Sequence, residues 1–205
     1  MKKKPPVLLY VPNLIGYIRL VSLFIVPFFI LHAPIISVCL YFFSASLDAL
    51  DGYLARRLGQ ESYVGAVLDY TIDRATLAVL QMTLALIYIP IWGFFAFVLI
   101  LDMVSHISHV YTSLFLKRRH HKEIIDNQSK LLKLYYSNRR VLFLTCFFHD
   151  LWFGFVYLHH FYPNQIWIKA GVVLILPFFL LKTIIHILQL WDSLASLIKL
   201  DELKD

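Results

Sequence analysis

Long continuous apolar segments make up most of the chain, and short polar breaks separate them. The segments cover residues 13–31, 34–54, 63–89, 91–116, 141–162 and 166–191. Most of them exceed the roughly 20 residues that a helix needs to cross the hydrocarbon core of a bilayer. They lack the period-two alternation of side chains that marks the strands of a membrane barrel. We therefore predict an all-α, polytopic membrane protein with six transmembrane helices.

Proline residues mark several of the breaks. Pro34 follows the first segment, Pro90 lies between the third and the fourth, and Pro163 precedes the last. Proline ends helices, and water satisfies the freed backbone groups only outside the hydrocarbon. Because no repeat, low-complexity stretch or folded extramembrane segment interrupts this pattern, we expect residues 1–205 to form a single membrane domain.

The composition supports the same class of protein. The 205 residues are 60% hydrophobic, and the mean hydropathy of +0.70 is too high for a soluble domain of this size. The first apolar segment contains Arg19 and no small-residue cleavage pattern, so we expect it to be retained as a helix. Cys39 and Cys146 lie within apolar segments, where cysteine behaves as a small hydrophobe, and we assign them no redox or metal role.

The net charge of +6 is distributed unevenly along the chain. On one side of a six-helix trace lie Lys2, Lys3, Lys4, Arg56, Arg57, Lys117, Arg118, Arg119, Lys122, Arg139, Arg140 and Lys199. The opposite loops hold little positive charge beyond Lys169. By the positive-inside rule we expect both termini to face the cytosol. The same basic rim would also attract anionic lipid headgroups, although topology determination is the preferred interpretation.

Residues 44–76 combine four aspartates with apolar surroundings. Asp48 and Asp51 are three residues apart and Asp69 and Asp73 are four apart, so each pair shares one face of a helix. A short polar turn at residues 59–62 folds the two helices back on each other as antiparallel neighbours. We therefore expect the four carboxylates to converge.

Four converging carboxylates need a cation. Without one they repel each other and some must take up protons. Ligand sets made only of oxygen select hard cations, here Mg²⁺ or Mn²⁺ before Zn²⁺, and four carboxylates suffice for two ions of the kind used in phosphoryl transfer. A purely structural role is the alternative, but unused membrane acids cost several kcal/mol, so we favour a cofactor site for two Mg²⁺ or Mn²⁺ ions.

Two glycines and two arginines accompany the aspartates. Gly52 and Gly65 remove side chains where a ligand or a facing helix comes close. For Gly65, helix packing in lipid is an equally good explanation. Arg56 lies at the cytosolic mouth, where a guanidinium can bridge two phosphate oxygens, whereas Arg57 is interpreted as a topology signal.

The same stretch resembles the CDP-alcohol phosphotransferase family, whose signature is D-x2-D-G-x2-A-R-x8-G-x3-D-x3-D. The fixed positions are filled, at the required spacing, by Asp48, Asp51, Gly52, Ala55, Arg56, Gly65, Asp69 and Asp73. The resemblance implies six transmembrane helices, a homodimer and a metal site that faces the cytosol. The helix count and the orientation agree with the expectations from hydropathy and charge.

Within that family the chain is most similar to the eukaryotic-type phosphatidylinositol synthases. The segments that carry this similarity include "VPNLIGYIRL" at 11–20, "LDMVSHISH" at 101–109 and "LYYSNRRVLF" at 134–143. The resemblance implies transfer of the phosphatidyl group of CDP-diacylglycerol to myo-inositol with release of CMP, and a location in the endoplasmic reticulum. Arg140 departs from the expected pattern, in which a proline follows the arginine of the last segment.

The resemblance also implies roles for the aspartates. Asp48, Asp51 and Asp69 would be metal ligands. Asp73 would contact metal and also take the proton from the acceptor hydroxyl. A carboxylate is a sufficient base there because a nearby dication stabilises the alkoxide as it forms.

Further residues are expected to contact the substrates. By resemblance, Gly52, Arg56 and Ser62 would bind the CDP part of CDP-diacylglycerol, and Asn13 is an additional candidate for this contact. Arg139 would line the acceptor pocket, where it would donate hydrogen bonds to inositol hydroxyls.

Several alternatives remain open from the sequence. The acceptor could instead be serine, glycerol phosphate or inositol phosphate, and a cation- or proton-coupled transporter is a different class that also uses intramembrane acids. Arg19 is expected to form a buried ion pair with one of the acids rather than to bind substrate. Asp102, His106 and His109 share a helix face; a metal site is conceivable, but without a fourth ligand nearby we favour a hydrogen-bonded polar seam. The role of Lys182 is open, and residues 193–205 are expected to form a frayed amphipathic tail.

Overall fold

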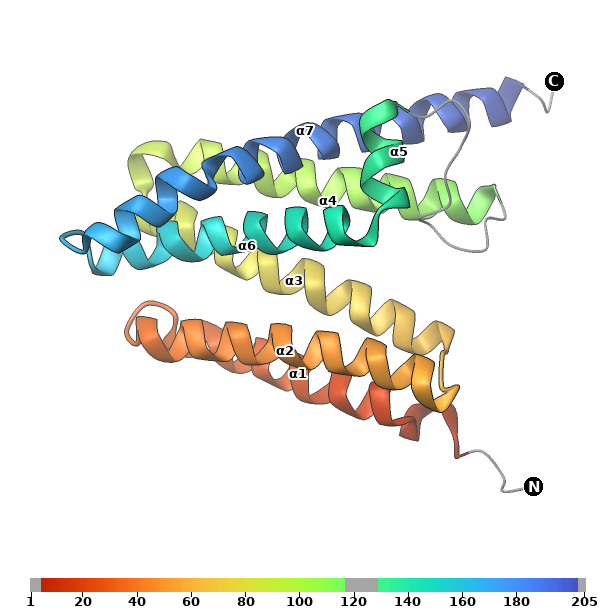
Figure 1. The fold of residues 1–205 in the computed structure, drawn as a ribbon, viewed down its shortest axis with the longest axis horizontal. Coiled ribbons are helices and arrows are strands. Elements are labelled where there is room, and N and C mark those ends of the chain that lie inside the picture. The colour runs from red at the N-terminus through yellow and green to blue at the C-terminus, as the bar shows by residue number, and fades with distance from the viewer. Residues whose placement is uncertain (1–4, 117–128, 203–205) are drawn as a thin grey trace. The chain divides into compact units, whose positions relative to one another are not determined.

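The structure, a computed structural model, describes residues 5–116 and 129–202, and these ranges are helical apart from short connections (Figure 1). The elements are η1 (Val7–Leu9), α1 (Val11–Phe29), α2 (Pro34–Leu58), α3 (Tyr63–Ile87), η2 (Ile89–Ile91), α4 (Trp92–Phe115), α5 (Lys130–Ser137), α6 (Arg139–Phe161) and α7 (Ile166–Glu202). No β-strand occurs in the two described ranges. The predicted all-α class is therefore confirmed.

Five of the described helical segments are long and apolar enough to cross a membrane. They are Val11–Phe29, Pro34–Leu58, Ile89–Phe115, Arg139–Phe161 and Ile166–Glu202. The expected third span, α3, is not among them although it has 25 residues. It carries Asp69, Asp73, Arg74 and Gln81 along one helix, which lowers its hydropathy. The described ranges thus support five spans by composition, and the predicted count of six is not confirmed.

The carboxy-terminal part of the chain differs from its prediction. α7 continues as one helix of 37 residues to Glu202, whereas a frayed tail was expected from residue 193 onward. Ser193 is buried on this helix, and its hydroxyl donates to the Gln189 carbonyl oxygen at 2.7 Å. Packing of the last turns in their own unit therefore extends the helix past the apolar segment. The basic residues predicted at 2–4 and 117–122 lie outside the described residues.

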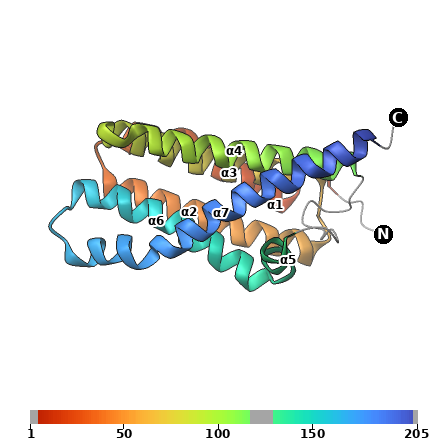
Figure 2. The same ribbon diagram turned by 90° about the horizontal axis from the view of Figure 1, so that it is seen from above.

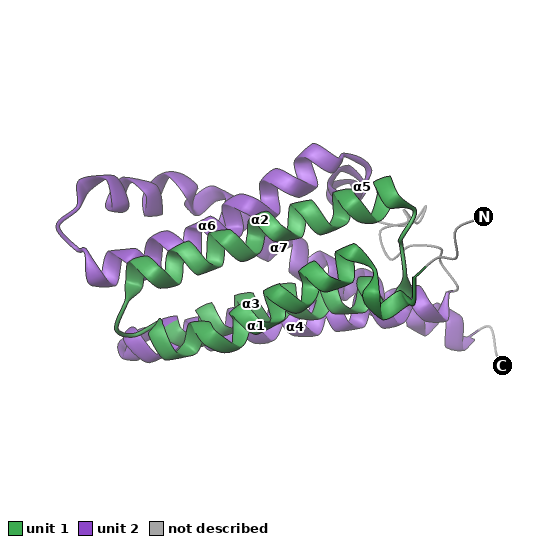
Figure 3. Cartoon of the chain, turned by 90° about the horizontal axis from the view of Figure 1, so that it is seen from below, with its two compact units in different colours: residues 1–83 green, residues 84–205 purple. Residues whose placement is uncertain are grey.

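The chain forms two compact units, residues 1–83 and 84–205, and α3 runs from the first into the second (Figure 3). In the first unit α1 packs against α2 as its antiparallel neighbour. α2 ends at Gly59, whose φ of 61° and ψ of 35° place it in the left-handed region that favours glycine. The Gln60 amide then donates to the Ala55 carbonyl at 2.9 Å, which closes the helix and starts the turn into α3.

Two glycines allow α1 and α3 to approach each other closely within the first unit. A Cβ atom at Gly16 would lie 2.6 Å from the Leu68 side chain. A Cβ atom at Gly65 would lie 2.7 Å from Asn13 Oδ1. Both positions exclude a side chain unless the neighbouring group moves. The packing alternative considered for Gly65 is therefore confirmed, and the contact places α1 beside the aspartate-bearing helix.

In the second unit α7 packs along both α6 and α4 (Figure 2). The short helix α5 lies against α6 and α7, and its Leu132 and Tyr135 form a core cluster with Ile185 of α7. Between α4 and α7 run polar contacts as well as apolar ones. Gln189 Nε2, for example, donates to the Ser105 carbonyl oxygen at 3.3 Å in a buried environment. The predicted polar seam on α4 is thus present, and α7 is its partner.

Candidate active site

The four aspartates of residues 44–76 converge, as predicted. Asp48 and Asp51 come from α2, and Asp69 and Asp73 come from the first turns of α3. Carboxylate oxygens of Asp48, Asp51 and Asp69 all lie within 4.8 Å of one another, close enough to share one metal ion. The turn at residues 59–62 produces this arrangement, because it reverses the chain and sets the two acidic helix faces opposite each other.

A buried guanidinium lies among these carboxylates. Arg19 of α1 is only 2% exposed and contacts all four aspartates. Its Nη1 lies 2.7 Å from Asp48 Oδ1, 3.0 Å from Asp51 Oδ2 and 3.1 Å from Asp69 Oδ1, and its Nη2 lies 2.6 Å from Asp73 Oδ1. The predicted ion pair of Arg19 is confirmed, but it involves four acids instead of one.

The carboxylates remain accessible although their cation is buried. The side chains of Asp48, Asp69 and Asp73 are 40%, 49% and 40% exposed, and that of Asp51 is 11% exposed. Arg19 supplies one guanidinium to four carboxylates and Arg74 adds positive charge near Asp73, so the ionised cluster keeps a net negative charge. A set of oxygen ligands with this excess charge fits a hard divalent cation, and the geometry of three convergent carboxylates agrees with that chemistry.

Gly52 and Arg56 lie on the carboxylate-bearing end of α2. A Cβ atom at Gly52 would meet Arg56 Nη1 at 3.5 Å, which is an ordinary van der Waals distance. Packing around Gly52 in the described part of the chain therefore does not demand a glycine. Arg56 itself is exposed in the last turn of α2. The contact of both residues with a phosphate ligand stays a prediction.

Ser62 and Asn13 have structural contacts in addition to their predicted roles. Ser62 Oγ accepts a hydrogen bond from the Gly65 amide at 3.0 Å and so caps the start of α3. Asn13 is 1% exposed and donates from Nδ2 to the Val7 carbonyl oxygen at 2.7 Å. Its Oδ1 is buried and accepts no hydrogen bond from the described residues. This free acceptor leaves Asn13 able to receive one more donor.

The predicted acceptor contact, Arg139, lies in the second unit. Arg139 and Arg140 begin α6 and are exposed there. Asn138 caps this helix, because its Oδ1 accepts from the Arg140 amide at 3.0 Å. The two arginines line an open recess of about 360 Å³ together with Phe143 and Leu144. The cap fixes the start of α6 beside this recess, whose lining is almost wholly apolar.

The polar residues predicted on α4 separate into two groups. Asp102 and His106 lie together, with His106 Nδ1 3.2 Å from Asp102 Oδ1. His109 instead stacks on Tyr136 of α5, with ring centroids 5.3 Å apart. The expected shared role of the three residues therefore holds only for Asp102 and His106. Burial raises the pKa of the Tyr136 phenol well above its ordinary value, so the hydroxyl beside His109 stays protonated.

The sequence interpretation missed His186 and His149, which complete this polar region. His186 Nε2 lies 3.4 Å from Asp102 Oδ1, and His149 Nδ1 lies 2.9 Å from Asp150 Oδ1. An ionisable residue inside a long apolar segment was the available signal, because such residues are costly in a membrane unless they have a partner. Lys182, whose role was open, donates from Nζ to the Tyr135 hydroxyl.

Comparisons with known proteins identify the family to which the chain is similar. The profile of the CDP-alcohol phosphatidyltransferase family matches residues 9–198, which span both units. A protein of Candida albicans named CDP-diacylglycerol–inositol 3-phosphatidyltransferase is 37% identical over 95% of this chain and 84% of its own length. Proteins with the same name are 38% identical in Saccharomyces cerevisiae, over 90% of this chain and 84% of theirs, and 34% identical in Homo sapiens, over 95% and 94%. No solved structure matches the chain significantly.

Long apolar helices, with acidic groups gathered where two of the helices meet, define an integral membrane protein that has a candidate cation site. The family within this class follows from the family profile, which matches most of the chain, and from the sequence identities to the relatives. The chain belongs to the CDP-alcohol phosphatidyltransferase family.

Proposed function

We propose that this protein is a phosphatidylinositol synthase, which transfers the phosphatidyl group of CDP-diacylglycerol to myo-inositol and releases CMP. The observation that carries the proposal is the convergence of the four signature aspartates at one place in the first unit. Relatives that share a third or more of their residues with this chain are named for this reaction. Their coverage of most of the chain supports the same substrates for this protein.

We infer that Asp48, Asp51, Asp69 and Asp73 hold Mg²⁺ or Mn²⁺, with two ions because four carboxylates suffice for a two-ion site of the kind used in phosphoryl transfer. Arg19 and the nearby Arg74 balance part of the charge of the four carboxylates, and the cofactor would balance the remainder. When bound, such ions neutralise the diphosphate of the nucleotide and stabilise the departing CMP. The chain itself contributes the ligand oxygens on two helices that a tight turn holds together.

Asp73 is the proposed base for the acceptor hydroxyl. Its Oδ1 accepts a hydrogen bond from Arg19 Nη2 at 2.6 Å, which fixes the orientation of the carboxylate. The side chain is 40% exposed, so a hydroxyl group arriving from solution can reach it. In the proposed step, the hydroxyl proton passes to this carboxylate while the oxygen bonds to the phosphorus of the phosphatidyl group, and the bond from that phosphorus to CMP breaks.

The substrate contacts are assigned to residues around this centre. Arg56 and Gly52 would hold the CDP phosphates, Ser62 would add a donor at the start of α3, and Asn13 would offer its unoccupied Oδ1. Arg139 would contact the acceptor from the start of α6. The proposal for Ser62 requires its hydroxyl to serve both the helix cap and the ligand, which one donor and two lone pairs permit.

We further propose that α3 is the sixth transmembrane helix. Its 25 residues span about 37 Å, enough for the hydrocarbon core, and its polar groups include those that Arg19 engages. With six spans both termini and the aspartates face the cytosol, and the basic residues agree with this orientation. By family resemblance the protein would act as a homodimer in the endoplasmic reticulum, with residues 1–205 forming one catalytic domain.

A second candidate acceptor is favoured by one observation. Two exposed arginines, Arg139 and Arg140, line the same recess at the start of α6. Paired guanidinium groups suit a phosphate better than a neutral polyol. A phosphorylated acceptor, either inositol phosphate or glycerol phosphate, is therefore the alternative, whereas serine and a transport function have no specific support in the described residues.

Release of CMP by the purified protein tests the proposal. CDP-diacylglycerol is supplied with myo-inositol, inositol phosphate, serine or glycerol phosphate, with EDTA or with added Mg²⁺ or Mn²⁺. We expect release with myo-inositol only, dependent on the added cation. Release that requires inositol phosphate or glycerol phosphate would transfer the assignment to the alternative, and no release with any alcohol would overturn the proposed function.

A further inference from the structure

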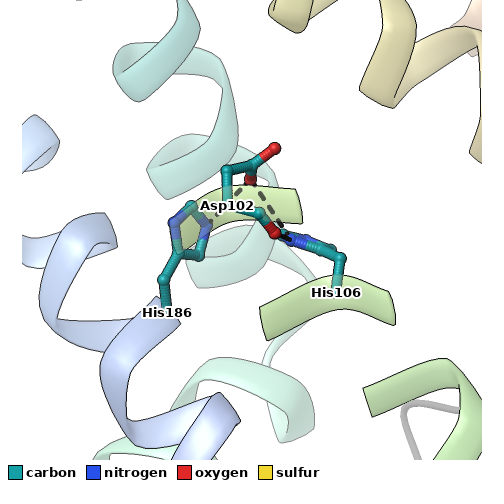
Figure 4. Close-up of side chains that lie close together, drawn as sticks. All are labelled: Asp102, His106 and His186. Atoms are coloured by element: carbon teal, nitrogen blue, oxygen red, sulfur yellow. Dashed lines mark hydrogen bonds and ion pairs between the residues drawn. The ribbon is translucent and has the colours of Figure 1, made fainter. Parts of the chain in front are cut away.

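A second group of metal-ligand side chains lies in the second unit, apart from the four aspartates in sequence. Asp102 and His106 come from α4 and His186 comes from α7. Figure 4 shows both imidazole rings turned toward the Asp102 carboxylate. One ligand atom from each of the three residues lies within 4.8 Å of the others.

Two of the three separations within this group match those of a metal polyhedron. Asp102 Oδ1 lies 3.2 Å from His106 Nδ1 and 3.4 Å from His186 Nε2. Four ligands at Zn²⁺ bond lengths of about 2.0–2.1 Å, arranged as a tetrahedron, lie about 3.3 Å from each other. The 3.4 Å between His186 Nε2 and Asp102 Oδ1 is longer than an ordinary hydrogen bond.

An independent observation comes from His186 itself. Its side chain is fully buried, and neither of its ring nitrogens has a hydrogen-bond partner in residues 5–116 and 129–202. Buried polar groups are almost always hydrogen-bonded, so a buried imidazole with two unsatisfied nitrogens needs an explanation. A polar seam explains His106, whose Nδ1 is also 2.9 Å from the Asp102 carbonyl oxygen, but it leaves His186 unsatisfied.

We propose that Asp102, His106 and His186 form a binding site for a transition-metal ion of the Zn²⁺ class, which ties α4 to α7. Two imidazole nitrogens and one carboxylate oxygen select Zn²⁺ over the hard cations that suit the four aspartates. Binding uses the lone pairs of His106 Nδ1 and His186 Nε2, so each ring carries its proton on the other nitrogen. His106 Nδ1 therefore gives up the hydrogen bond to the Asp102 carbonyl oxygen when the ion binds. The site is independent of the proposed transfer reaction.

His149 of α6 is the protein group suited to a fourth position. Its Nδ1 is 2.9 Å from Asp150 Oδ1, an arrangement that puts the proton on Nδ1 and leaves a lone pair on Nε2. His149 Nε2 is buried and has no hydrogen-bond partner among the described residues. The His149 and His186 rings are 5.6 Å apart between centroids. A water molecule completes the coordination if His149 stays in its present position.

Metal titration of the purified full-length chain tests this site. Metal-free protein is titrated with Zn²⁺ in competition with a chelator, and with Co²⁺ while its visible absorption is recorded. We expect one ion with the spectrum of a four-coordinate site containing nitrogen ligands. His186→Leu and His106→Gln should each weaken this binding at least about tenfold.

Two matched variants separate this site from others. His32→Ala removes an exposed histidine after α1 and should leave the binding unchanged. Asp51→Asn alters the four-aspartate cluster and should leave the nitrogen-ligand spectrum unchanged, even where CMP release fails. If His186→Leu does not fold, His106→Gln carries the test, because its side chain is 17% exposed at the edge of the cluster.

Two results would overturn the proposal. One is a titration in which the wild-type protein binds Zn²⁺ at the four-aspartate cluster only, with no further ion bound. The other is unchanged Zn²⁺ affinity in Asp102→Asn and His106→Gln, since Asp102→Asn keeps a hydrogen-bonding side chain of the same size while removing the anionic ligand.

Discussion

Arg19 Nη2 lies 2.6 Å from Asp73 Oδ1, and this contact joins the first transmembrane segment to the residue proposed as the base. The same guanidinium reaches the other three signature aspartates and is almost completely buried. A single side chain therefore organises all the carboxylates of the site. Its removal and the removal of each carboxylate have different, measurable consequences.

Asp73→Asn should abolish turnover while CDP-diacylglycerol still binds. The amide cannot accept the hydroxyl proton, and loss of a general base costs about 100- to 10,000-fold in rate. CMP release and equilibrium binding of the nucleotide lipid, measured on the same preparation, check this. Glu202→Gln, an exposed acid at the end of α7, is the matched control and should be fully active. Equal loss of binding and turnover would reduce Asp73 to a metal ligand only.

Arg19→Gln should destabilise the metal-free protein and make added cation more stabilising. The variant leaves four carboxylates without their buried counter-ion. Since three of them are 40% or more exposed, the cost should be roughly 1–3 kcal/mol, below that of a fully buried pair. We expect the Tm to fall by about 3–10 °C in EDTA. Mn²⁺ should restore more of the Tm in the variant than in the wild type, and equal Mn²⁺ shifts would contradict this role.

Gly65→Ala should reduce both stability and activity. The added Cβ would lie 2.7 Å from Asn13 Oδ1 and 3.1 Å from Ser62 Oγ, so α1 and α3 must separate. Overpacking of this kind costs about 1–3 kcal/mol. Gly93→Ala is the control, because a Cβ there meets no heavy atom of the structure within 4 Å. Thermal unfolding and CMP release of the two variants give the comparison, and similar behaviour would show that the close contact is unimportant.

Ser62 is expected to act both as a helix cap and as a ligand of the nucleotide. Ser62→Ala removes the acceptor of the Gly65 amide and should cost about 1 kcal/mol. Ser62→Asp restores the cap but adds negative charge beside the diphosphate. We expect Ser62→Asp to recover stability and to lose affinity for CDP-diacylglycerol. Full recovery of both properties would confine Ser62 to capping α3.

Arg139→Ala should raise the KM for the acceptor by about tenfold, the amount typical of losing a hydrogen bond from a charged donor. Arg140→Ala should raise it less, since resemblance assigns the acceptor contact to Arg139. Both residues line the same recess, so Arg140→Ala is the matched control for Arg139→Ala. Initial rates at varied myo-inositol concentration separate KM from kcat. A larger effect at Arg140 would reverse the assignment.

The sequence was sufficient to predict the helices and the acidic cluster because both depend on local properties. Apolar length and helical periodicity placed the helices of residues 13–54 and 141–191, and fixed spacing placed each pair of aspartates on one face. The same local properties failed at α3, whose hydropathy is lowered by Asp69 and Asp73, and beyond residue 193, where tertiary packing extends α7.

Only the tertiary structure determines the contacts between helices that are distant in sequence. Arg19 lies in a different helix from all four aspartates, and nothing in its own segment shows that it serves the whole cluster. His186 meets Asp102 because α7 packs on α4, while His109, which shares a helix with Asp102, stacks on Tyr136. Sequence spacing determines which side chains share a face, and packing determines what that face meets.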